Sequence, residues 1–420
     1  MNIAHRNAVN DSDTSPSRVY AWYVVLALML CQVLASIDSR LPFIMVESIK
    51  QDLGLSDTQI GLITGPAFSL TYAICAIPIA RLSDRGNRVA IISIAIAVWS
   101  MFTAMAGFTK GFGTFALTRI GVAAGESALT PAAHSIVANY LQGPARAKGL
   151  AVYSVGVAIG AFAAFALGGY IGDRFGWRTA FLCVGGGGMV LVMLLLTTVR
   201  EPAREPQSEA KSLPRGNVRS LFQNPMIRNI VFGGTLLGCS AGALNAWGPA
   251  YVMRTFNLSA TETGASFGVV AGIVAMVGIL SGGFISSWLT ERDPRYALQM
   301  LGGAFTIAMV TQIAALLSSN YTLFLVLLAV TVLLSSFYLG PTFAAIQSAV
   351  DPSARSFASA VTLFCINGVG IASGSFVVGL LSDLMVIWGE NSLKWALISV
   401  SWLKAWSAFH YWRASRSMKP

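Results

Sequence analysis

The chain has 420 residues, of which 55% are hydrophobic and 11% charged, and its mean hydropathy is +0.66. A soluble domain carries roughly 25% charged residues, so these charges are too few to cover a water-facing surface and lipid must be the main solvent. The net charge of +10 would suit nucleic-acid binding in a soluble protein, but here the distribution of the basic residues between the predicted loops offers a different explanation.

Twelve apolar stretches are long enough to cross a bilayer, which takes about 20 helical residues. Six precede a polar stretch at 200–226 and six follow it. They are 20–46, 59–80, 89–108, 113–139, 148–170, 179–199, 227–253, 263–290, 296–317, 321–348, 356–383 and 393–412. The predicted fold is an all-α membrane protein of twelve transmembrane helices in two six-helix bundles, 20–199 and 227–412. Residues 1–19 and 413–420 are interpreted as cytoplasmic tails, and 200–226, with its prolines and mixed charges, as a cytoplasmic linker.

The basic residues are distributed unequally between the two sides of the membrane. With a cytoplasmic N-terminus, the segments on that side hold 19 of the 28 Lys and Arg residues, and the segments on the other side hold six. This bias is the positive-inside pattern. It predicts a multi-pass protein of the cell inner membrane with both termini in the cytoplasm, and it explains the basic character without any nucleic acid.

The two predicted bundles repeat each other in sequence. Corresponding features recur at an interval of about 210 residues, which indicates internal duplication. The matched pairs are Asp84-Arg85-x-x-Arg88 with Glu291-Arg292-x-x-Arg295, Pro131 with Pro341, Arg146 with Arg355, and Gly169-x-x-x-Asp173 with Gly379-x-x-x-Asp383. Parallel repeats of this kind predict alternating access around a site near the middle of the membrane, where the halves meet.

Four charged residues fall inside predicted spans of the first half, where charges are costly and usually functional. They are Asp38 and Arg40 in the first span, and Arg119 and Glu126 in the fourth. The helical rise places Asp38 and Arg119 at similar depth, so they could pair, and it places Glu126 two turns deeper on the face of Arg119.

A carboxylate at that depth loses hydration, which favours its neutral form, whereas a nearby arginine favours the ionised form. This competition would let Asp38 or Glu126 load and release a proton, so we predict that both couple transport to protons together with Arg119. The alternatives are a fixed charge network that locks the two spans together, and an Arg119 that grips an anionic substrate group. Arg40 either lines the substrate cavity or extends toward water at the outer surface.

The second half offers uncharged groups in place of these charges. Asn245, Trp247, Tyr338 and Asn367 are predicted to line the substrate cavity, because polar and aromatic side chains suit an amphipathic molecule. For each of them, helix packing is the competing explanation. Lys404 in the last span is expected to extend toward the cytoplasmic surface.

Asp84-Arg85-Gly-Asn-Arg88, between the second and third spans, resembles the signature loop of the major facilitator superfamily, although Ala80 replaces the usual first glycine. Within that superfamily the chain is similar to the Spinster branch, whose animal members move lysolipids and sphingosine phosphate, and it fits a bacterial homologue. Leu117-Thr118-Arg119 with Gly125-Glu126, and Arg200-Glu201-Pro202, carry this likeness. The branch's adjacent Asp-Arg pair of the first helix is interrupted here as Asp38-Ser39-Arg40.

The resemblance favours a conformational latch formed by Asp84, Arg85 and Arg88, which would close the cytoplasmic side while the outer side is open. Glu291, Arg292 and Arg295 would form its weaker copy. The alternative is a solvated turn that only sets the topology of the chain.

These features predict a proton-coupled secondary transporter of a lipid-like or amphipathic solute, acting as a monomer in the bilayer. Uptake of a small organic anion with protons, and drug efflux, are the alternatives. Drug efflux is disfavoured, because drug/proton antiporters of this superfamily usually carry a Gly-Pro motif in the fifth span. Here no proline lies between Pro144 and Pro202. A lipid-modifying enzyme is disfavoured, because no nucleophile–His–acid set and no HExxH spacing occur. We expect no metal and no cofactor, and the lack of a GxxxxGK[ST] loop argues against ATP.

Overall fold

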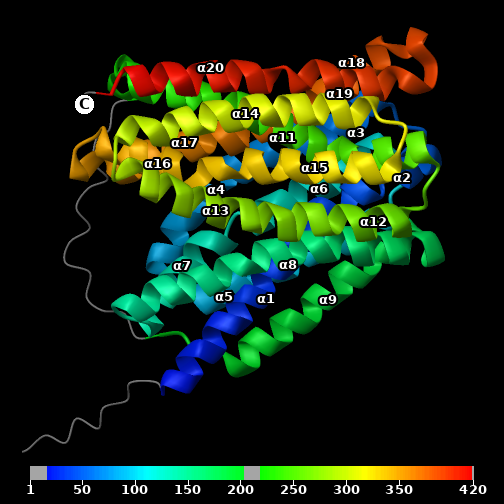
Figure 1. Ribbon diagram of the computed structural model, residues 1–420. Coiled ribbons are helices and arrows are strands. Elements are labelled where there is room, and N and C mark those ends of the chain that lie inside the picture. Colours follow the sequence, from blue (N-terminus) through cyan, green and yellow to red (C-terminus); the bar gives the residue numbers. More distant parts are fainter. Residues whose placement is uncertain (1–16, 203–217, 419–420) are drawn as a thin grey trace, which may run out of the picture.

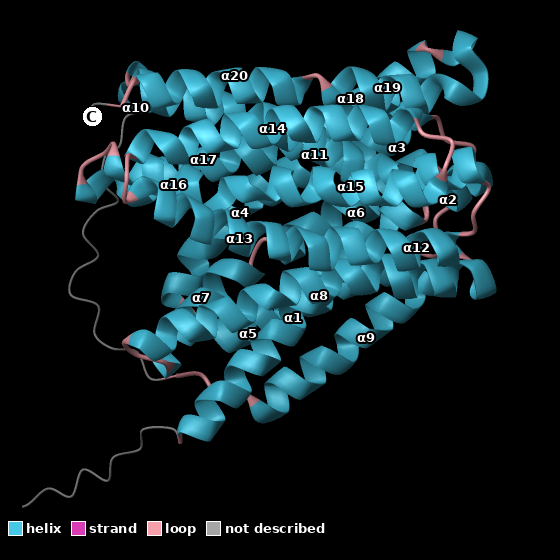
Figure 2. Ribbon diagram, in the orientation of Figure 1, coloured by secondary structure: helices cyan, strands magenta, loops and turns pink. Residues whose placement is uncertain are grey.

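The computed structural model describes residues 17–202 and 218–418, except for the side chains at 77, 80, 81, 84, 85 and 353. All regular elements in these ranges are helices, and no strand occurs in them (Figure 2). Most of the predicted N-terminal tail and of the predicted linker lies outside the described residues. The chain therefore forms the all-α bundle that its composition predicts.

The N-terminal half runs from α1 to α9 and the C-terminal half from α11 to α20, and they lie side by side (Figure 1). The first half consists of α1 (Arg18–Ile44), α2 (Val46–Leu53), α3 (Asp57–Leu62), η1 (Ile63–Ala67), α4 (Phe68–Arg85), α5 (Arg88–Ala106), α6 (Phe112–Glu126), α7 (Leu129–Tyr140), α8 (Pro144–Phe175) and α9 (Trp177–Thr198). A short α10 (Val218–Gln223) precedes the second half.

The C-terminal half has the same order of long helices. It consists of α11 (Pro225–Phe256), α12 (Ala260–Gly268), η2 (Val269–Val274), α13 (Ala275–Thr290), α14 (Pro294–Leu317), α15 (Tyr321–Ser335), η3 (Ser336–Tyr338), α16 (Leu339–Ser348), η4 (Pro352–Ala354), α17 (Arg355–Leu363), η5 (Phe364–Ile371), α18 (Ala372–Leu384), η6 (Val386–Asn391), α19 (Ser392–Ser401) and α20 (Leu403–Arg416).

Ten helical runs within the described residues are long and apolar enough to cross a membrane. The other two predicted spans are also helical, but each is interrupted. The fourth consists of α6 and α7, separated at Ser127 and Ala128, and the twelfth consists of α19 and α20, separated at Trp402. With these two, the helices account for the twelve predicted spans.

The halves share a core at one end only. We call the end where α1 begins and α20 finishes the terminal end, and the opposite end, near α2 and the start of α12, the distal end (Figure 1). Near the distal end, Leu41 and Ile44 of α1 belong to one buried cluster with Trp247 and Tyr251 of α11. Toward the terminal end, each half has a separate buried cluster of its own.

Glycines allow the halves to approach closely at the distal end. A side chain at Gly264 of α12 would clash with the Phe165 carbonyl oxygen of α8, and one at Gly61 of α3 would clash with the Ser375 carbonyl oxygen of α18. These two crossings occupy equivalent positions in the two halves. Small residues at membrane helix crossings let backbones pack directly, so these glycines bring the two halves into close contact at the distal end.

Candidate functional site

A cavity of about 650 Å³ lies between the halves. Its walls come from α8 and α11, from the run α12–η2–α13, and from the tenth span, with single residues of α1, η5 and α20. Along α8 the lining covers residues 151–161, in the part of the helix nearer the terminal end. The lining is mainly aliphatic, with Arg40, Asn245, Tyr338 and Lys404 among its few polar groups.

Asp38 and Arg119 form the buried ion pair that their equal depth allows. Both side chains are 1% exposed, and Arg119 Nη1 donates to Asp38 Oδ1 at 3.0 Å. Arg119 Nη2 reaches the Asp38 backbone oxygen at 3.3 Å, and its guanidinium lies 5.2 Å from the centre of the Phe68 ring. The pair therefore ties α1 to α6 inside the N-terminal half.

The Thr103 hydroxyl is a further partner of Asp38. It contacts Asp38 Oδ2 and also lies 2.9 Å from the Trp99 carbonyl oxygen. A hydroxyl has one proton, so it can donate to only one of these two oxygens. The sequence pattern gave no reason to select Thr103, since a threonine in an apolar helix usually bonds to its own backbone.

Glu126 is the second buried carboxylate of this cluster. Its side chain is largely buried, and its Oε1 has no hydrogen-bond partner among the described residues. Asp38, Arg119 and Arg40 all lie within electrostatic range of it. Glu126 is also the last residue of α6, so the interruption of the fourth span begins at this carboxylate.

Arg40 faces the cavity from α1. Its Nη1 donates to Ser36 Oγ at 2.7 Å, which bends the side chain back along its own helix. The alternative in which Arg40 extends to the outer surface is therefore wrong. Arg40 supplies positive charge to the cavity wall from the N-terminal half.

Of the four polar residues predicted for the C-terminal half, two line the cavity and two do not. Asn245 and Tyr338 are lining residues. Trp247 is completely buried and donates from its indole to the Ser375 carbonyl oxygen at 2.8 Å, so it packs α11 against α18. Asn367 is an exposed residue of η5 that does not line this cavity. The prediction that Trp247 lines the cavity is therefore wrong, and helix packing accounts for this residue.

Lys404 does not extend to the cytoplasmic surface, so that expectation is wrong. It is 1% exposed and lies at the middle of the span formed by α19 and α20. Its Nζ donates to Ser240 Oγ at 2.9 Å and contacts Gln312 Oε1. A lysine at the centre of a membrane helix costs roughly 2.5–3.5 kcal/mol on insertion scales, so hydrogen-bonding partners on α11 and α14 hold it inside the bundle.

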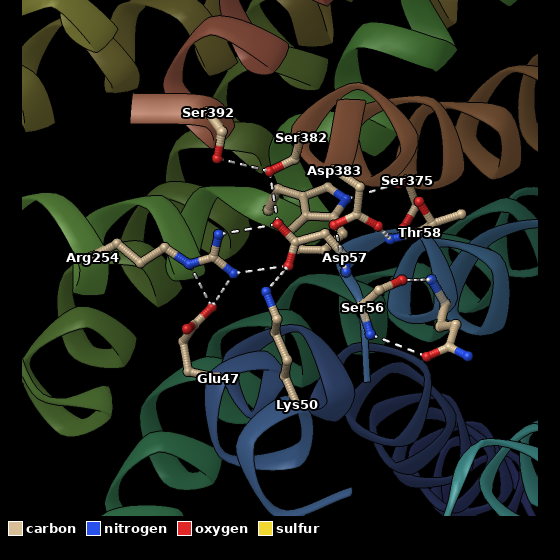
Figure 3. Close-up of polar contacts among 12 residues, drawn as sticks. Glu47, Lys50, Ser56, Asp57, Thr58, Arg254, Ser375, Ser382, Asp383 and Ser392 are labelled. Carbon is tan, nitrogen blue, oxygen red and sulfur yellow. Dashed lines mark hydrogen bonds and ion pairs between the residues drawn. The ribbon is translucent and has the colours of Figure 1, made fainter. Parts of the chain in front are cut away.

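A network of charged side chains closes the distal end between the halves (Figure 3). Arg254, near the end of α11, donates from Nη1 and Nη2 to the two carboxylate oxygens of Asp57 at 3.1 and 3.0 Å. It also donates to Glu47 at 2.9 Å, and Lys50 contacts Asp57 at 2.5 Å. Because the bonds to Asp57 form a bidentate pair, they fix orientation as well as distance.

Two aspartates cap helices of the opposite half at this end. Asp383 of α18 accepts from the backbone N–H groups of Asp57 and Thr58 at 3.2 and 2.8 Å, at the start of α3 (Figure 3). Asp173 of α8 accepts from Ala260 and Thr261 at 3.2 and 2.6 Å, at the start of α12. These are the aspartates of the repeated Gly-x-x-x-Asp pattern, which could have identified them as equivalent.

The predicted latch residues make no described contact across the halves. Arg88 donates to Glu201 at 2.7 Å and to Asn139 at 2.5 Å, both in its own half. Arg295 donates to the Met418 carbonyl oxygen, and Arg292 stacks over Trp288 with Glu291 beside it at the end of α13. The side chains of Asp84 and Arg85 lie outside the described atoms, so the latch stays a prediction.

Every hydrogen bond or ion pair that joins two described residues of opposite halves lies in the distal part of the molecule. Two related six-span halves, closed against each other at one end and with a cavity between them, define a secondary transporter rather than an enzyme. The chain belongs to the Major Facilitator Superfamily, whose profile matches residues 28–385.

Known proteins refine this assignment. An MFS-type efflux pump of Mycolicibacterium smegmatis is 34% identical, with 94% of this chain and 92% of the pump aligned. Protein spinster homolog 1 of Xenopus tropicalis is 26% identical over 86% of this chain and 72% of its own. A crystal structure of a bacterial homolog to the human lysosomal transporter Spinster, in an inward-facing and unoccupied conformation, superposes with a TM-score of 0.85 at 28% identity, covering 96% of this chain and 98% of that one. The resemblance to the Spinster branch is thereby confirmed.

Proposed function

We propose that this protein is a proton-coupled secondary transporter that moves a lipid-like or amphipathic organic solute by alternating access. It acts as a monomer in the cell inner membrane, with both termini in the cytoplasm. The observation that carries the proposal is a buried cluster of two carboxylates and two arginines beside a mainly aliphatic cavity between the halves.

The charge bias of the loops supports the orientation. Of the lysines and arginines that the structure describes, most lie in the segments at the terminal end, and such residues accumulate on the cytoplasmic side. With this orientation, the distal network closes the outer side and the described state faces the cytoplasm. The similar Spinster homolog was also crystallised facing inward.

The hydrogen bonds of Asp38 support proton coupling. The Thr103 proton can satisfy either Asp38 or Trp99. A protonated Asp38 would donate to Thr103 while Thr103 donates to Trp99, so the site accommodates both charge states of Asp38. Glu126 has one buried oxygen without a partner among the described residues, and it is equally suited to carry a proton, because a neutral carboxyl loses less hydration than a carboxylate.

The cavity supports the class of solute. Aliphatic side chains of α8, α11 and α13 form most of its surface, so an apolar body gains free energy when it leaves water. Arg40, Asn245 and Tyr338 provide contacts for a polar head group. The relatives include an efflux pump and Spinster proteins, and export of an amphipathic molecule would suit both.

Purified protein in liposomes with an internal pH dye tests the proposal. A panel of single-chain phospholipids, a cationic dye and a hexuronate is presented under a pH gradient. We expect a proton flux that depends on an amphipathic member of the panel, and a loss of about tenfold or more in Asp38→Asn and Glu126→Gln, because neither amide can carry the proton.

Asp52→Asn is the matched control, since this acid pairs with Arg178 at the distal surface away from the cavity. It should keep the wild-type flux. Full coupling in both Asp38→Asn and Glu126→Gln would refute the assignment of the proton site, and flux with the hexuronate alone would favour the organic-anion alternative.

A further inference from the structure

Lys404 is a buried cation that takes no part in the proposed proton coupling by Asp38, Arg119 and Glu126. It lies on α20, against α11 and α14, and is 1% exposed. Asp38 and Arg119 belong to the other half, and neither is among the hydrogen-bond partners of Lys404. The C-terminal half therefore has its own charged group at mid-membrane depth.

No acidic side chain neutralises Lys404 among the described residues. Its two hydrogen-bond partners, Ser240 and Gln312, are uncharged, and no ion pair of the described structure includes it. An ammonium group has three protons, so two partners leave one to be directed elsewhere. A buried cation without a counter-ion is unfavourable, which makes the site receptive to an anion.

Lys404 also belongs to the wall of the central cavity. Ser335 of α15 is another residue of the C-terminal half that lines this cavity, and its buried hydroxyl has no hydrogen-bond partner among the described residues. Among the described residues, the lining from the C-terminal half therefore includes a positive charge without a counter-ion and a hydroxyl donor without a partner. Both features favour a ligand that carries anionic oxygen atoms.

We propose that Lys404 forms an anion site in the wall of the C-terminal half, which binds the carboxylate or phosphate group of a molecule held in the central cavity. The aliphatic wall contributed by α8 and α13 takes the apolar part of that molecule. The inference rests on the proposed function in one respect, because it takes the cavity to be the binding place of the transported solute.

Binding to protein in nanodiscs of uncharged phosphatidylcholine tests the site. The probes are dodecyl phosphate, dodecanoate and uncharged monolauroylglycerol, with inorganic phosphate and acetate as free anions. We expect the wild type to bind the two anionic amphiphiles about tenfold more tightly than the uncharged one, and Lys404→Gln to lose this difference while its affinity for monolauroylglycerol stays unchanged.

Two further variants keep the test decisive. Lys404→Arg retains the charge and should retain the preference for anionic amphiphiles. Gln312→Glu supplies an internal counter-ion to Lys404, so it should lose the preference even if Lys404→Gln does not fold. Lys394→Gln, in the same span but away from the cavity, is the control and should bind as the wild type does.

The free anions show whether the site binds a small anion or only the charged head group of an amphiphile. Binding of inorganic phosphate or acetate that depends on Lys404 would support the site for small anions, and binding of the amphiphiles alone would support a head-group site. An unchanged preference in both Lys404→Gln and Gln312→Glu would overturn the proposal. If binding depends on Lys404 but no probe gives a proton-linked flux, the anion site stands and the proposed function fails.

Discussion

The guanidinium of Arg119 is shared between the side chain and the backbone of Asp38, at 3.0 Å from Oδ1 and 3.3 Å from the carbonyl oxygen. Its Nε is buried and has no hydrogen-bond partner among the described residues, and the centre of the Phe68 ring lies 5.2 Å from Cζ. A planar group with several fixed donors can make such contacts at once, whereas the ammonium of lysine is a single point charge.

Substitutions at Arg119 separate proton tuning from substrate binding. If Arg119 mainly tunes the carboxylates, Arg119→Lys should keep part of the transport and displace its pH optimum. If it grips an anionic group, the same change should weaken substrate binding more than it alters the pH profile. Proteoliposome uptake at a series of pH values, together with substrate binding, measures both.

Arg119→Ala should abolish transport under either interpretation. Removing one partner of a buried ion pair costs about 3–5 kcal/mol, unless the remaining group changes its protonation state. Size-exclusion chromatography should show that the variant is still folded and inserted, because the remaining Asp38 can take up a proton. Full activity in Arg119→Ala would mean that the charge is merely tolerated at this position.

The sequence could predict that Asp38 and Arg119 pair, because helical rise and hydropathy determine their depth. It could not predict the position of Lys404. The partners Ser240 and Gln312 are uncharged residues on two other helices, so no local pattern marks them. The sequence could not place Trp247 for a related reason. An indole suits a binding site and a packed core equally well until its N–H partner is known.

At the scale of elements, α3 and α12 begin in the same way. Each has a capping box, formed by Ser56 with Gln59 and by Ser259 with Glu262. Each also receives a carboxylate from the opposite half, Asp383 for α3 and Asp173 for α12. The N–H groups at a helix start attract negative charge, so these caps hold the distal end closed.

Asp173 and Asp383 each cap a helix of the opposite half, and we call these contacts the crossed caps. Removing them should open the distal end. Loss of an N-cap side chain costs about 1 kcal/mol, so Asp173→Ala or Asp383→Ala should each shift the balance toward the distal-open form about fivefold. The double variant should show both effects, because well-separated sites are nearly additive. Spin labels at Lys110 and Ser319, exposed on distal loops of the two halves, should report longer distances.

Asp293 provides the matched control for this experiment. It caps α14 by accepting from the Arg295 N–H at 2.8 Å, entirely within the C-terminal half. Asp293→Ala should reduce stability but leave the distal distances unchanged. An equal distance change in Asp293→Ala and in the crossed-cap variants would show that the caps act on general stability and not on the contact between halves.

Hydropathy predicts most of these elements well but not their interruptions. The span expected at 227–253 is α11, Pro225–Phe256, and the span expected at 321–348 is the run from α15 to α16. The breaks at Ser127–Ala128 and at Trp402 leave no mark in an apolar pattern, since hydropathy does not report backbone hydrogen bonds. The crossed caps were equally hidden, because backbone N–H groups are present at the start of every helix.

At the scale of the whole molecule, the two ends carry different kinds of contact. A shared core, glycine crossings and charged side chains join the halves at the distal end. Toward the terminal end, the described clusters are separate, and Arg88 and Arg295 bond within their own halves. Alternating access requires a second set of contacts that closes the terminal end when the distal network opens.

Labels on the terminal loops can follow that second set of contacts. Gln142, between α7 and α8, and Asp351, between α16 and η4, are exposed on opposite halves. In a background without the five native cysteines, spin labels there report the width of the terminal mouth. The distal pair at Lys110 and Ser319 reports the opposite end in the same variants.

Asp84→Asn should shift the protein toward forms that are open at the terminal end, because the change removes the acidic member of the predicted latch. Distances between Gln142 and Asp351 should lengthen, and distances between the distal labels should shorten. Loss of one surface charge interaction is worth about 1 kcal/mol, so the shift in populations should be about fivefold. Glu390 is an exposed acid of η6, and Glu390→Gln serves as the control. It should change neither the terminal nor the distal distance distribution. Unchanged terminal distances in Asp84→Asn would leave the loop as a solvated turn that sets topology, and the contacts that close the terminal end would then have to come from other residues.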